Sequence, residues 1–424
     1  MKILLITAAF PPVGGSHMQR MLNLANYLIK DGHEVNVIAY KPSNDYPNID
    51  ISSINDVSKR IKIWYVQEGF LHRKIRKKVV SSHSDDLNKS KIKKFKKVLF
   101  NYRKKMLIPD PLIDWLPEVI KYEKRLKIVE QIKPDLIISS SMPNTAHIIG
   151  YQLSKKYKVP MMMDYGDPWT YEVSIERGLV RRYIDYFLES RIIKHSQMIT
   201  VATENTRMLY INKFKVPESK ISTFMMGYTP AQKLITNEEI SYSPKISFIY
   251  GGMLNPIHRN PIPFIEAINN FSSFDIECKF RTNVSKDLIE KLTNTKSLVR
   301  VEPLIPFDQF IEELYAADVL VLFGNSTPIQ IAGKVFNYMS TGKHILYIKN
   351  MPKDIDDPVE KIMEEYGNST IVQNNSKEIY KSILNLIDLK KNGDLKIKYS
   401  EKINKYTWES QVFALSRNIR RKFT

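Results

Sequence analysis

The chain has 424 residues, of which 43% are hydrophobic and 26% are charged, the composition of a soluble globular protein with two or three domains. Cys278 is the single cysteine, which excludes an intramolecular disulfide, and no apolar run approaches the roughly 20 residues that a membrane-spanning helix needs. The formal net charge of +19 predicts a polyanionic partner, either a nucleic acid or an anionic membrane surface.

The beginning of the chain predicts a strand, a helix and a second strand. Residues 2–8 are an apolar strand, and because this strand starts at the second residue we expect no signal peptide. A loop that contains Gly14 and Gly15 leads to a helix over about residues 18–30, and a strand at 33–40 follows. The loop lacks G-x-G-x-x-G, so the unit is typical of a Rossmann-like domain without a nicotinamide site.

Residues 71–105 are the most basic part of the chain and carry +12 of the net charge. From residue 91 onward apolar side chains recur at helical spacing with lysines between them, which predicts a basic amphipathic helix. We interpret the stretch as an insertion of about residues 71–108 that binds an anionic membrane surface. The residues predicted to bind the membrane are Lys93, Lys94, Phe95, Lys96, Lys97 and Leu99.

Two other interpretations of this basic insertion stay open. It could be a solvated insertion whose apolar stripe packs on its own domain. It could also bind nucleic acid, which the sequence disfavours because interleaved aromatic residues are few and no recognition motif appears.

Beyond the insertion, apolar strands alternate with helices, which is the rhythm of a doubly wound parallel sheet. A polar stretch at 229–244 contains prolines and predicts a linker between two domains. The predicted helices cover about residues 117–131, 145–157, 177–195 and 205–213, and the predicted strands cover 134–140, 159–163 and 198–202, with 221–227 closing the domain.

Asp167 follows one of these strands in the sequence D-Y-G-D-P-W. Ligands of doubly wound sheets gather at the carboxyl ends of the strands, where a loop carboxylate can accept or orient the proton of a hydroxyl group. Asp167 also has the position of a helix N-cap, directly before Pro168 at the first helical position. From the sequence, the chemical and the capping interpretations of Asp167 both stand.

Residues 318–348 predict the binding site of the second half. An apolar strand at 319–323 is followed by a polar, turn-forming stretch, a helix at 334–339 that Gly342 ends, and a second strand. Because the loop leads into a helix N-terminus with Lys334 beside it, the unit can bind an anion, although an ordinary α/β crossover has the same pattern.

Arg259 lies in the loop after the first strand of this half and offers a planar guanidinium for phosphate oxygens. Asp354 and Asp356 form a D-x-D pair, but His and acidic residues are otherwise scattered, so we expect no metal site. The remaining predicted elements are strands at 246–250, 276–280 and 299–301, a helix at 263–270, a helical charged stretch at 375–404, and a last helix that ends near residue 422.

Four short motifs resemble nucleotide-sugar glycosyltransferases with two Rossmann-like domains, the GT-B enzymes, and in particular the large retaining family four. In chain order they are F-P-P-V-G-G with G-H-E-V, D-Y-G-D-P-W, G-G-M-L-N-P-I-H-R-N-P, and G-K-V-F-N-Y-M-S-T-G-K-H-I-L. The resemblance covers residues 1–40, 109–170 and 246–424.

This resemblance implies an α/β fold in which two Rossmann-like domains face each other across a cleft, with the basic helical insertion in the first. The implied domains are an acceptor domain at 1–228 and a nucleotide-sugar domain at 229–404. A helix at 405–424 is expected to cross back to the first domain.

The same resemblance implies the site residues, and Asp167 is expected on the acceptor side. Asn337 stands where the family usually has an acidic residue for the ribose hydroxyls, Ile329 is not acidic either, and Gly166 stands where relatives often have Arg. The residues implied at the donor diphosphate are Gly14, Gly15, Arg259, Ala332, Gly333 and Lys334, and those implied at the ribose or sugar are Asn337 and Ile331.

The implied activity is transfer of a sugar from a nucleotide-sugar donor to a lipid-linked or membrane-presented glycan, as in bacterial surface polysaccharide assembly. The resemblance implies a retaining, metal-independent reaction in which the nucleotide sugar is a substrate, and no separate cofactor is expected. Together with the basic insertion, it places the protein in the cytoplasm, peripheral on the inner leaflet of the membrane.

Two alternative functions remain. Ile329 and Asn337 motivate a non-catalytic partner subunit that kept the GT-B fold and lost turnover. A nucleotide-sugar epimerase of the same fold would need acid and base groups on both sides of the sugar, and the sequence does not indicate such a set.

Overall fold

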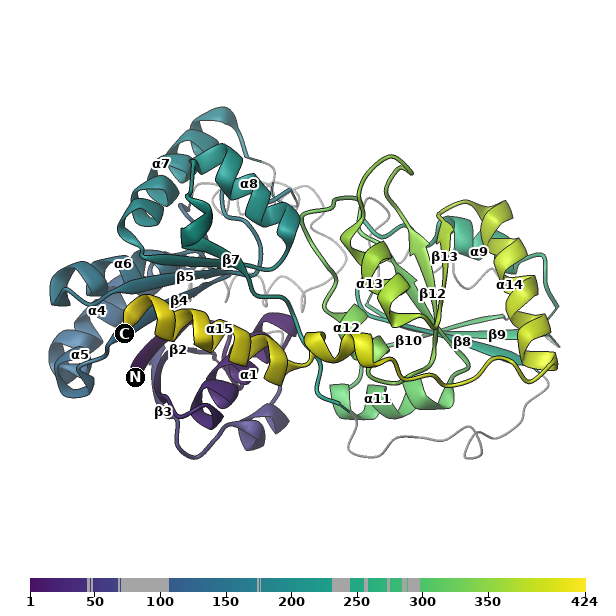
Figure 1. The fold of residues 1–424 in the computed structure, drawn as a ribbon, viewed down its shortest axis with the longest axis horizontal. Coiled ribbons are helices and arrows are strands. Elements are labelled where there is room, and N and C mark those ends of the chain that lie inside the picture. Colours follow the sequence, from purple (N-terminus) through teal and green to yellow (C-terminus); the bar gives the residue numbers. More distant parts are fainter. Residues whose placement is uncertain are drawn as a thin grey trace, which may run out of the picture. The chain divides into compact units, whose positions relative to one another are not determined.

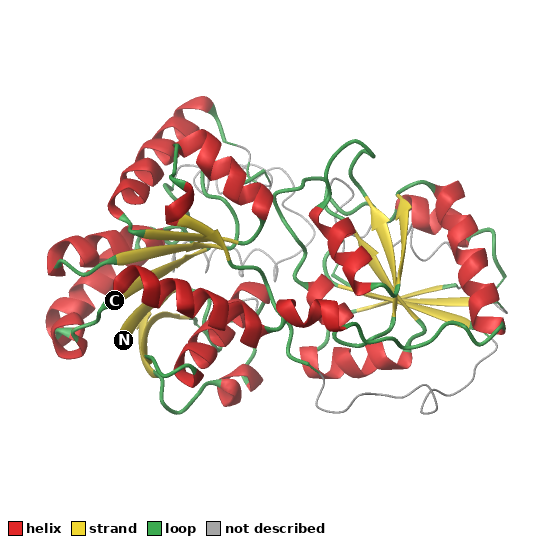
Figure 2. Ribbon diagram, viewed as in Figure 1, coloured by secondary structure: helices red, strands yellow, loops and turns green. Residues whose placement is uncertain are grey.

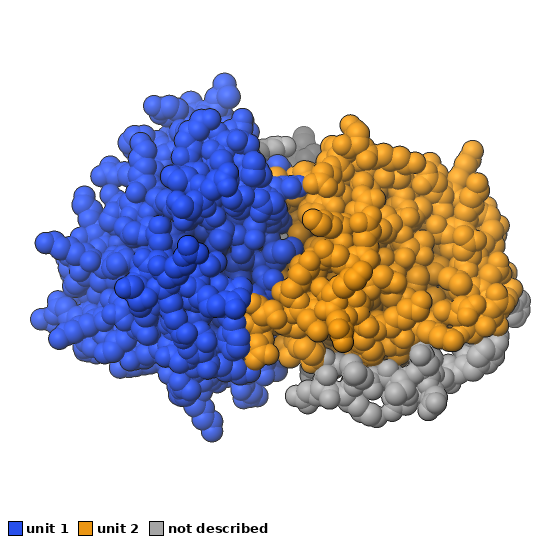
Figure 3. Space-filling model, in the orientation of Figure 1, with its two compact units in different colours: residues 1–225, 411–424 blue, residues 226–410 orange. Residues whose placement is uncertain are grey.

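The computed structural model describes residues 1–43, 46, 49–67, 69, 107–173, 175, 177–230, 245–254, 258–272, 275–283, 288 and 298–424. The chain forms two compact units, drawn in different colours in Figure 3: unit 1 is Met1–Met225 with Gln411–Thr424, and unit 2 is Met226–Ser410. The basic stretch at 71–105, with its six predicted membrane-binding residues, lies outside the described residues, so its helix stays a prediction.

Unit 1 is built on a sheet of seven parallel strands in the order β3-β2-β1-β4-β5-β6-β7 (Figure 1). Its strands are short apolar runs, and β1 and β4 are buried along nearly their whole length because helices cover both faces. The strands are β1 Lys2–Thr7, β2 Glu34–Lys41, β3 Lys62–Gln67, β4 Leu136–Ser141, β5 Met161–Tyr165, β6 Met198–Val201 and β7 Ile221–Thr223.

Successive side chains of β1 point to opposite faces of the sheet, as a strand requires. Leu4 and Ile6 pack in one cluster with residues of α4, α5 and α6, whereas the buried face of α1 carries Met21 and Leu24. The helices of unit 1 are α1 Ser16–Lys30, α4 Trp115–Leu126, α5 Ile128–Ile132, α6 Thr145–Tyr157, α7 Leu179–His195 and α8 Glu204–Phe214, with short 3₁₀ helices η1 Ser52–Asp56 and η2 Glu218–Lys220.

The C-terminal helix α15, Trp408–Phe423, carries the chain from unit 2 back into unit 1. Val412 and Ile419 on this helix are fully buried. The Ser416 hydroxyl donates a hydrogen bond to Asp31 and lies 2.7 Å from Nε2 of His33, so the helix is tied to the turn between α1 and β2.

Unit 2 repeats the same plan, a central sheet with helices packed around it (Figure 2). Its six parallel strands have the order β10-β9-β8-β11-β12-β13. The rings of Phe264, Phe280 and Phe323 pack together in its core, where α9 and α14 cover one face of the sheet. The strands are β8 Ile246–Gly251, β9 Ile276–Arg281, β10 Val299–Glu302, β11 Val319–Phe323, β12 His344–Lys349 and β13 Ser369–Gln373. The helices are α9 Ile262–Ile268, α11 Phe307–Ala316, α12 Lys334–Met339, α13 Pro358–Tyr366 and α14 Ser376–Lys391, with the 3₁₀ helix η4 Glu401–Tyr406.

Two predicted helices differ in the structure. The helix expected over 117–131 is divided into α4 and α5 at Lys127, which has a positive φ of 49°. The helical stretch expected over 375–404 is wrong in its second half, because α14 ends at Lys391 and Gly393 follows with a φ of 73°. Gly393 is the kind of residue that ends a helix, and residues 394–400 then have no regular structure.

Candidate functional site

In each unit, the strand order reverses between two neighbouring parallel strands, β1 and β4 in unit 1 and β8 and β11 in unit 2. Ligands of doubly wound sheets bind at the carboxyl ends of such strands, where the following loops diverge. In unit 1, Gly14 and Gly15 follow β1. In unit 2, Arg259 lies in the loop after β8, and Lys334 begins the helix that follows the loop after β11. The topology therefore places these predicted residues at the two switch points.

In unit 2 the structure brings Arg259 and Lys334 together through the phenol of Tyr250, at the carboxyl end of β8. Lys334 donates hydrogen bonds from Nζ to the Tyr250 hydroxyl at 2.8 Å and to the Gly251 carbonyl at 2.6 Å. Arg259 lies close enough to Tyr250 to act against the burial that raises the pKa of this phenol, and the Tyr250 hydroxyl donates to the Met253 carbonyl at 2.8 Å. The Tyr250 phenol therefore lies beside both basic side chains.

Both cations lack a neutralising carboxylate among the residues that the structure describes. Burial lowers the pKa of Lys334 well below its usual value, and the positive charge of Arg259 lowers it further. Burial also raises the pKa of the Tyr250 phenol, so that group stays neutral. An anion placed here would offset the positive charge of Arg259 and raise the pKa of Lys334 toward its usual value.

Gly252 provides the space for the Lys334 ammonium. It has a φ of 125°, and a Cβ atom at this position would lie 2.4 Å from Nζ of Lys334. A side chain here would therefore be strained in its backbone and would displace the lysine as well. Gly252, directly after β8, lets the loop pass close to the beginning of α12.

Asparagines at the ends of neighbouring strands hold the loop that carries Arg259. Asn325, which is buried, accepts a hydrogen bond from Nε of Arg259 at 2.8 Å and donates to the Gln330 carbonyl at 2.9 Å. Asn350 donates to the His258 carbonyl at 3.0 Å, and Asn374 donates to the Asn260 carbonyl at 2.9 Å. No role was predicted for these asparagines from the sequence, although Asn325 and Asn350 each follow closely on an apolar strand.

The other predicted donor residues lie on the loop and helix after β11. Ala332 is buried, Ile331 and Asn337 are half-buried, and Gly333 directly precedes α12. Because α12 has only six residues, its dipole is weaker than that of a long helix. The positive character of this site therefore rests on the side chains of Arg259 and Lys334.

In unit 1 a buried ion pair lies below the switch point. Arg20 of α1 donates to Asp164 of β5 from Nη2 at 2.7 Å and from Nε at 3.2 Å, and both side chains are almost fully buried. Ser140 donates to the same carboxylate at 2.7 Å and Thr200 donates at 2.8 Å. Burial by itself would raise the pKa of Asp164, but Arg20 and these hydrogen bonds hold it below its usual value.

His17 continues this network toward the loop that carries Gly14 and Gly15. Its Nε2 lies 3.2 Å from the Ser140 hydroxyl, which already donates its proton to Asp164, so Nε2 carries the hydrogen and Nδ1 is bare. Burial lowers the pKa of His17 to about 4, which keeps the ring neutral at pH 7. No role for His17 could be predicted from the sequence, because its partners are 123 and more residues away.

Gly166 lies directly against His17. A Cβ atom at Gly166 would come within 3.0 Å of Nδ1 of His17, so the imidazole occupies the space that a side chain at position 166 would need. The beginning of α1 and the loop after β5 therefore meet at the carboxyl edge of the unit 1 sheet. Gly15 is exposed with a φ of 110°, and Gly14 is half-buried.

Asp167 is half-buried and follows β5 directly. The helix-capping interpretation is wrong, because residues 168–173 form turns and the next helix, α7, begins at Leu179. The segment is held in place by Trp169, which is fully buried and donates from its indole nitrogen to Asp185 of α7 at 3.0 Å.

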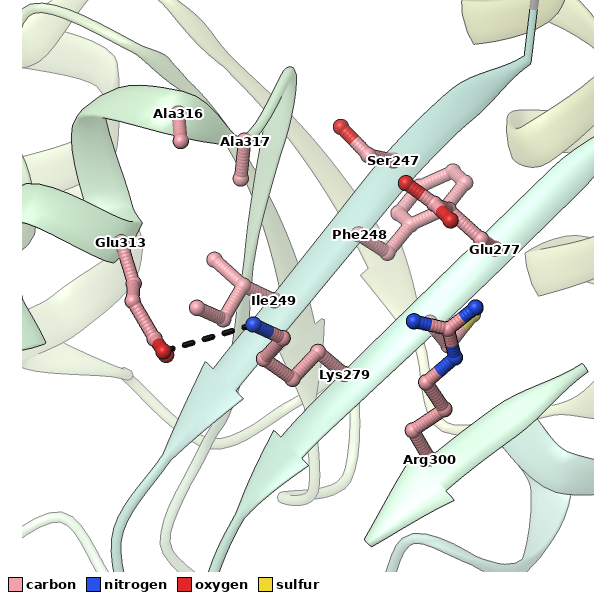
Figure 4. Close-up of a pocket in the computed structure, with 10 residues that line it drawn as sticks. Ser247, Phe248, Ile249, Glu277, Lys279, Arg300, Glu313, Ala316 and Ala317 are labelled. Carbon is pink, nitrogen blue, oxygen red and sulfur yellow. Dashed lines mark hydrogen bonds and ion pairs between the residues drawn. The ribbon is translucent and has the colours of Figure 1, made fainter. Parts of the chain in front are cut away.

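A cavity of about 180 Å³ lies elsewhere in unit 2, between α11 and the strands β8, β9 and β10 (Figure 4). Lys279 and Glu313, which lie 3.3 Å apart, are on its wall. None of the predicted site residues lines this cavity, so we do not assign it to the donor.

Among the described residues, no three His, Cys, Asp or Glu side chains come together in a way that could hold a metal ion. No helix in the described part of the chain has the length and apolar character needed to cross a bilayer.

Solved structures share the fold over the whole chain. Sucrose-phosphate synthase from Thermosynechococcus elongatus matches with a TM-score of 0.65 at 14% identity, covering 100% of this chain and 99% of that chain. HepE from Anabaena, solved in complex with UDP and glucose, matches with a TM-score of 0.64 at 12% identity over 99% and 100% of the two chains. UDP-GlcNAc 2-epimerase from Neisseria meningitidis, bound to UDP-GlcNAc, matches with a TM-score of 0.55 at 12% identity over 99% and 100%.

These likenesses confirm the predicted fold class, an α/β chain of two Rossmann-like domains as in GT-B proteins. A scan against models of protein families and a comparison with curated protein sequences both found no match.

Proposed function

We propose that this protein is a glycosyltransferase that takes a sugar from a nucleotide-sugar donor, and that the donor's diphosphate binds at Arg259 and Lys334. The observation that carries the proposal is that Arg259 and Lys334 lie together beside Tyr250 without a carboxylate partner among the described residues. Support also comes from HepE, a structure of the same fold that holds UDP and glucose.

The same two side chains explain how the reaction would be accelerated. When the bond between sugar and diphosphate breaks, negative charge develops on the departing phosphate oxygen. Arg259 and Lys334 would stabilise this charge more strongly than they stabilise the intact donor, because their positions are already held by Asn325 and Tyr250. By resemblance to family four, we propose a retaining and metal-independent transfer.

We place the acceptor at the carboxyl edge of unit 1, near His17 and Asp167. The bare Nδ1 of neutral His17 can accept a hydrogen bond from a sugar hydroxyl, and the Asp167 carboxylate can orient another. The proposed acceptor is a lipid-linked or membrane-presented glycan. The basic residues at 71–105 would bind the anionic inner leaflet of the membrane and bring the enzyme to that acceptor.

An epimerase of nucleotide sugars is the second candidate, favoured by the likeness to the Neisseria UDP-GlcNAc 2-epimerase. A non-catalytic partner subunit is the third, since Asn337 replaces the acidic residue expected at the ribose. The three candidates share donor binding and differ in what happens to the bound sugar.

A thermal-shift screen with UDP, GDP, ADP and their common sugars tests donor binding. We expect one nucleotide series to raise the melting temperature, and we expect Arg259→Ala to remove most of this increase. Absence of any shift in the folded wild-type protein would contradict the proposal. For the nucleotide sugar that binds, incubation with the protein followed by product analysis then separates hydrolysis or transfer from epimerisation and from no turnover.

A further inference from the structure

The most exposed apolar side chains of the described chain gather around the beginning of α7. Fifteen large apolar side chains are strongly exposed, and seven of them lie between residues 173 and 187. This concentration is unusual, because exposed apolar side chains on soluble proteins are normally scattered singly. The four most exposed on the helix, which we call the α7 apolar face, are Leu179 (85%), Val180 (75%), Tyr183 (71%) and Phe187 (57%).

The α7 apolar face is separate from the side of the helix that holds it in the fold. Leu179, Tyr183 and Phe187 are spaced four residues apart and therefore form one stripe. The buried side of α7 carries Ile192 and Ile193 instead, which pack in the core of unit 1. The described part of unit 1 therefore does not use the exposed stripe for its own packing, and α7 lies at the outer edge of that unit (Figure 1).

The acidic and basic side chains of α7 also lie on different sides of the helix. Its two acidic residues, Asp185 and Glu189, are fully buried, Asp185 in ion pairs with arginines and Glu189 in hydrogen bonds with Tyr210 and Thr170. The exposed charged side chains of the helix are all basic, namely Arg182, Arg191 and Lys194. The outward side of α7 is thus apolar at its beginning and cationic along its length.

This combination of exposed apolar and basic side chains is typical of a surface that contacts lipid. Aromatic and aliphatic side chains partition into the boundary between headgroups and acyl chains, while Arg and Lys beside them bind anionic headgroups. Each basic residue near such a surface adds to the affinity for anionic lipid. A stripe of two helical turns is too short to cross a bilayer and has the size for shallow insertion.

We propose that the α7 apolar face inserts into the headgroup region of an anionic bilayer, with Arg182, Arg191 and Lys194 on the lipid phosphates. This contact is separate from the membrane contact proposed for residues 71–105. Only the biological role of this contact rests on the proposed function, because that role is to bring the acceptor edge of unit 1 to a membrane-bound glycan. Binding to lipid itself can be measured without any donor or turnover.

The test is co-sedimentation of the full chain with vesicles of phosphatidylglycerol and phosphatidylcholine, compared with vesicles of phosphatidylcholine alone. We expect binding to the anionic vesicles, and we expect the double substitution Leu179→Asp with Tyr183→Asp to weaken it about tenfold or more. Leu384→Asp is the matched control, since Leu384 is an exposed leucine (39%) on α14 of unit 2. This control should bind as the wild type does. A second variant, Arg182→Gln with Lys194→Gln, should weaken binding to anionic vesicles as well.

Three results would overturn the proposal. Unchanged vesicle binding by the Leu179/Tyr183 double variant would show that the face does not touch lipid. A lower melting temperature of that variant would show that the face packs inside the chain, and a smaller oligomer would show that it contacts a second copy. Donor binding is measured separately, as the increase in melting temperature that a nucleotide causes. A failure of donor binding is therefore distinguishable from a failure of membrane binding.

Discussion

The ammonium group of Lys334 occupies the space that a Cβ atom on Gly252 would need, since such an atom would lie 2.4 Å from Nζ. This relationship joins the glycine after β8 to the lysine at the start of α12. It explains why the loop after β8 must be small for Lys334 to reach both Tyr250 and the Gly251 carbonyl.

Gly252→Ala should therefore weaken nucleotide binding and stability together. The positive φ of 125° strains any side chain, at a cost of about 1–3 kcal/mol in unfolding free energy, and the methyl group displaces Lys334. Gly367→Ala is the matched control, because Gly367 has a φ of 72° but its nearest neighbour would be 4.0 Å from the new Cβ. Denaturant unfolding should show a loss for both variants, whereas nucleotide titration should show weaker binding only for Gly252→Ala. Equal nucleotide affinity in the two variants would contradict the role of Gly252.

Lys334→Met should separate stability from ligand binding. The wild-type ammonium is buried beside Arg259, which lowers its pKa, so its removal relieves an unfavourable charge. We expect the unliganded variant to melt no lower than the wild type, and we expect a nucleoside diphosphate to raise its melting temperature much less. A large loss of stability with a normal nucleotide shift would show that Lys334 is only structural.

Asp164→Asn should destabilise unit 1 by about 3–5 kcal/mol, because Arg20 would be left as a buried charge without its carboxylate. Replacing both members, Arg20→Leu with Asp164→Asn, should cost less than the sum of the single changes. The measurement is a double-mutant cycle of unfolding free energies. Additive losses would show that the ion pair contributes no coupling.

His17 should make stability depend on pH. Burial lowers its pKa from 6.5 to about 4, with Asp164 raising it and Arg20 lowering it to smaller extents. Between these two values the unfolded chain binds a proton that the folded protein does not, so the free energy of unfolding falls as the pH is lowered from about 6.5 to 4. His17→Gln lacks this titration, so its stability should fall less over the same range. Parallel pH profiles of the two proteins would exclude a buried neutral His17.

Asp167→Asn should reduce turnover without lowering the melting temperature, because no helix begins at Pro168 for Asp167 to cap. The two measurements are initial rates with the donor identified by thermal shift and the melting temperature of the variant. A matching loss in both would show that Asp167 acts in the structure of its loop.

Most strands of the fold could be predicted because each is a short apolar run between turn residues, a pattern that a few neighbouring residues determine. The division between α4 and α5 at Lys127 could not be predicted, because the residue with a positive φ is a lysine and not a glycine. Strand β13 was also missed, because it lies at the edge of its sheet and carries polar residues such as Ser369 and Gln373.

The sequence by itself determined the α/β rhythm, the glycine that ends α12, and the presence of Arg259 and Lys334 in loops after apolar strands. All of these depend on residues close together in the chain. Only the tertiary structure joined Lys334 to Tyr250 across 84 residues and Arg20 to Asp164 across 144, because strand order decides which loops meet at one edge. Packing likewise decided that the α7 apolar face points outward, since helical periodicity shows that a stripe exists but not what covers it.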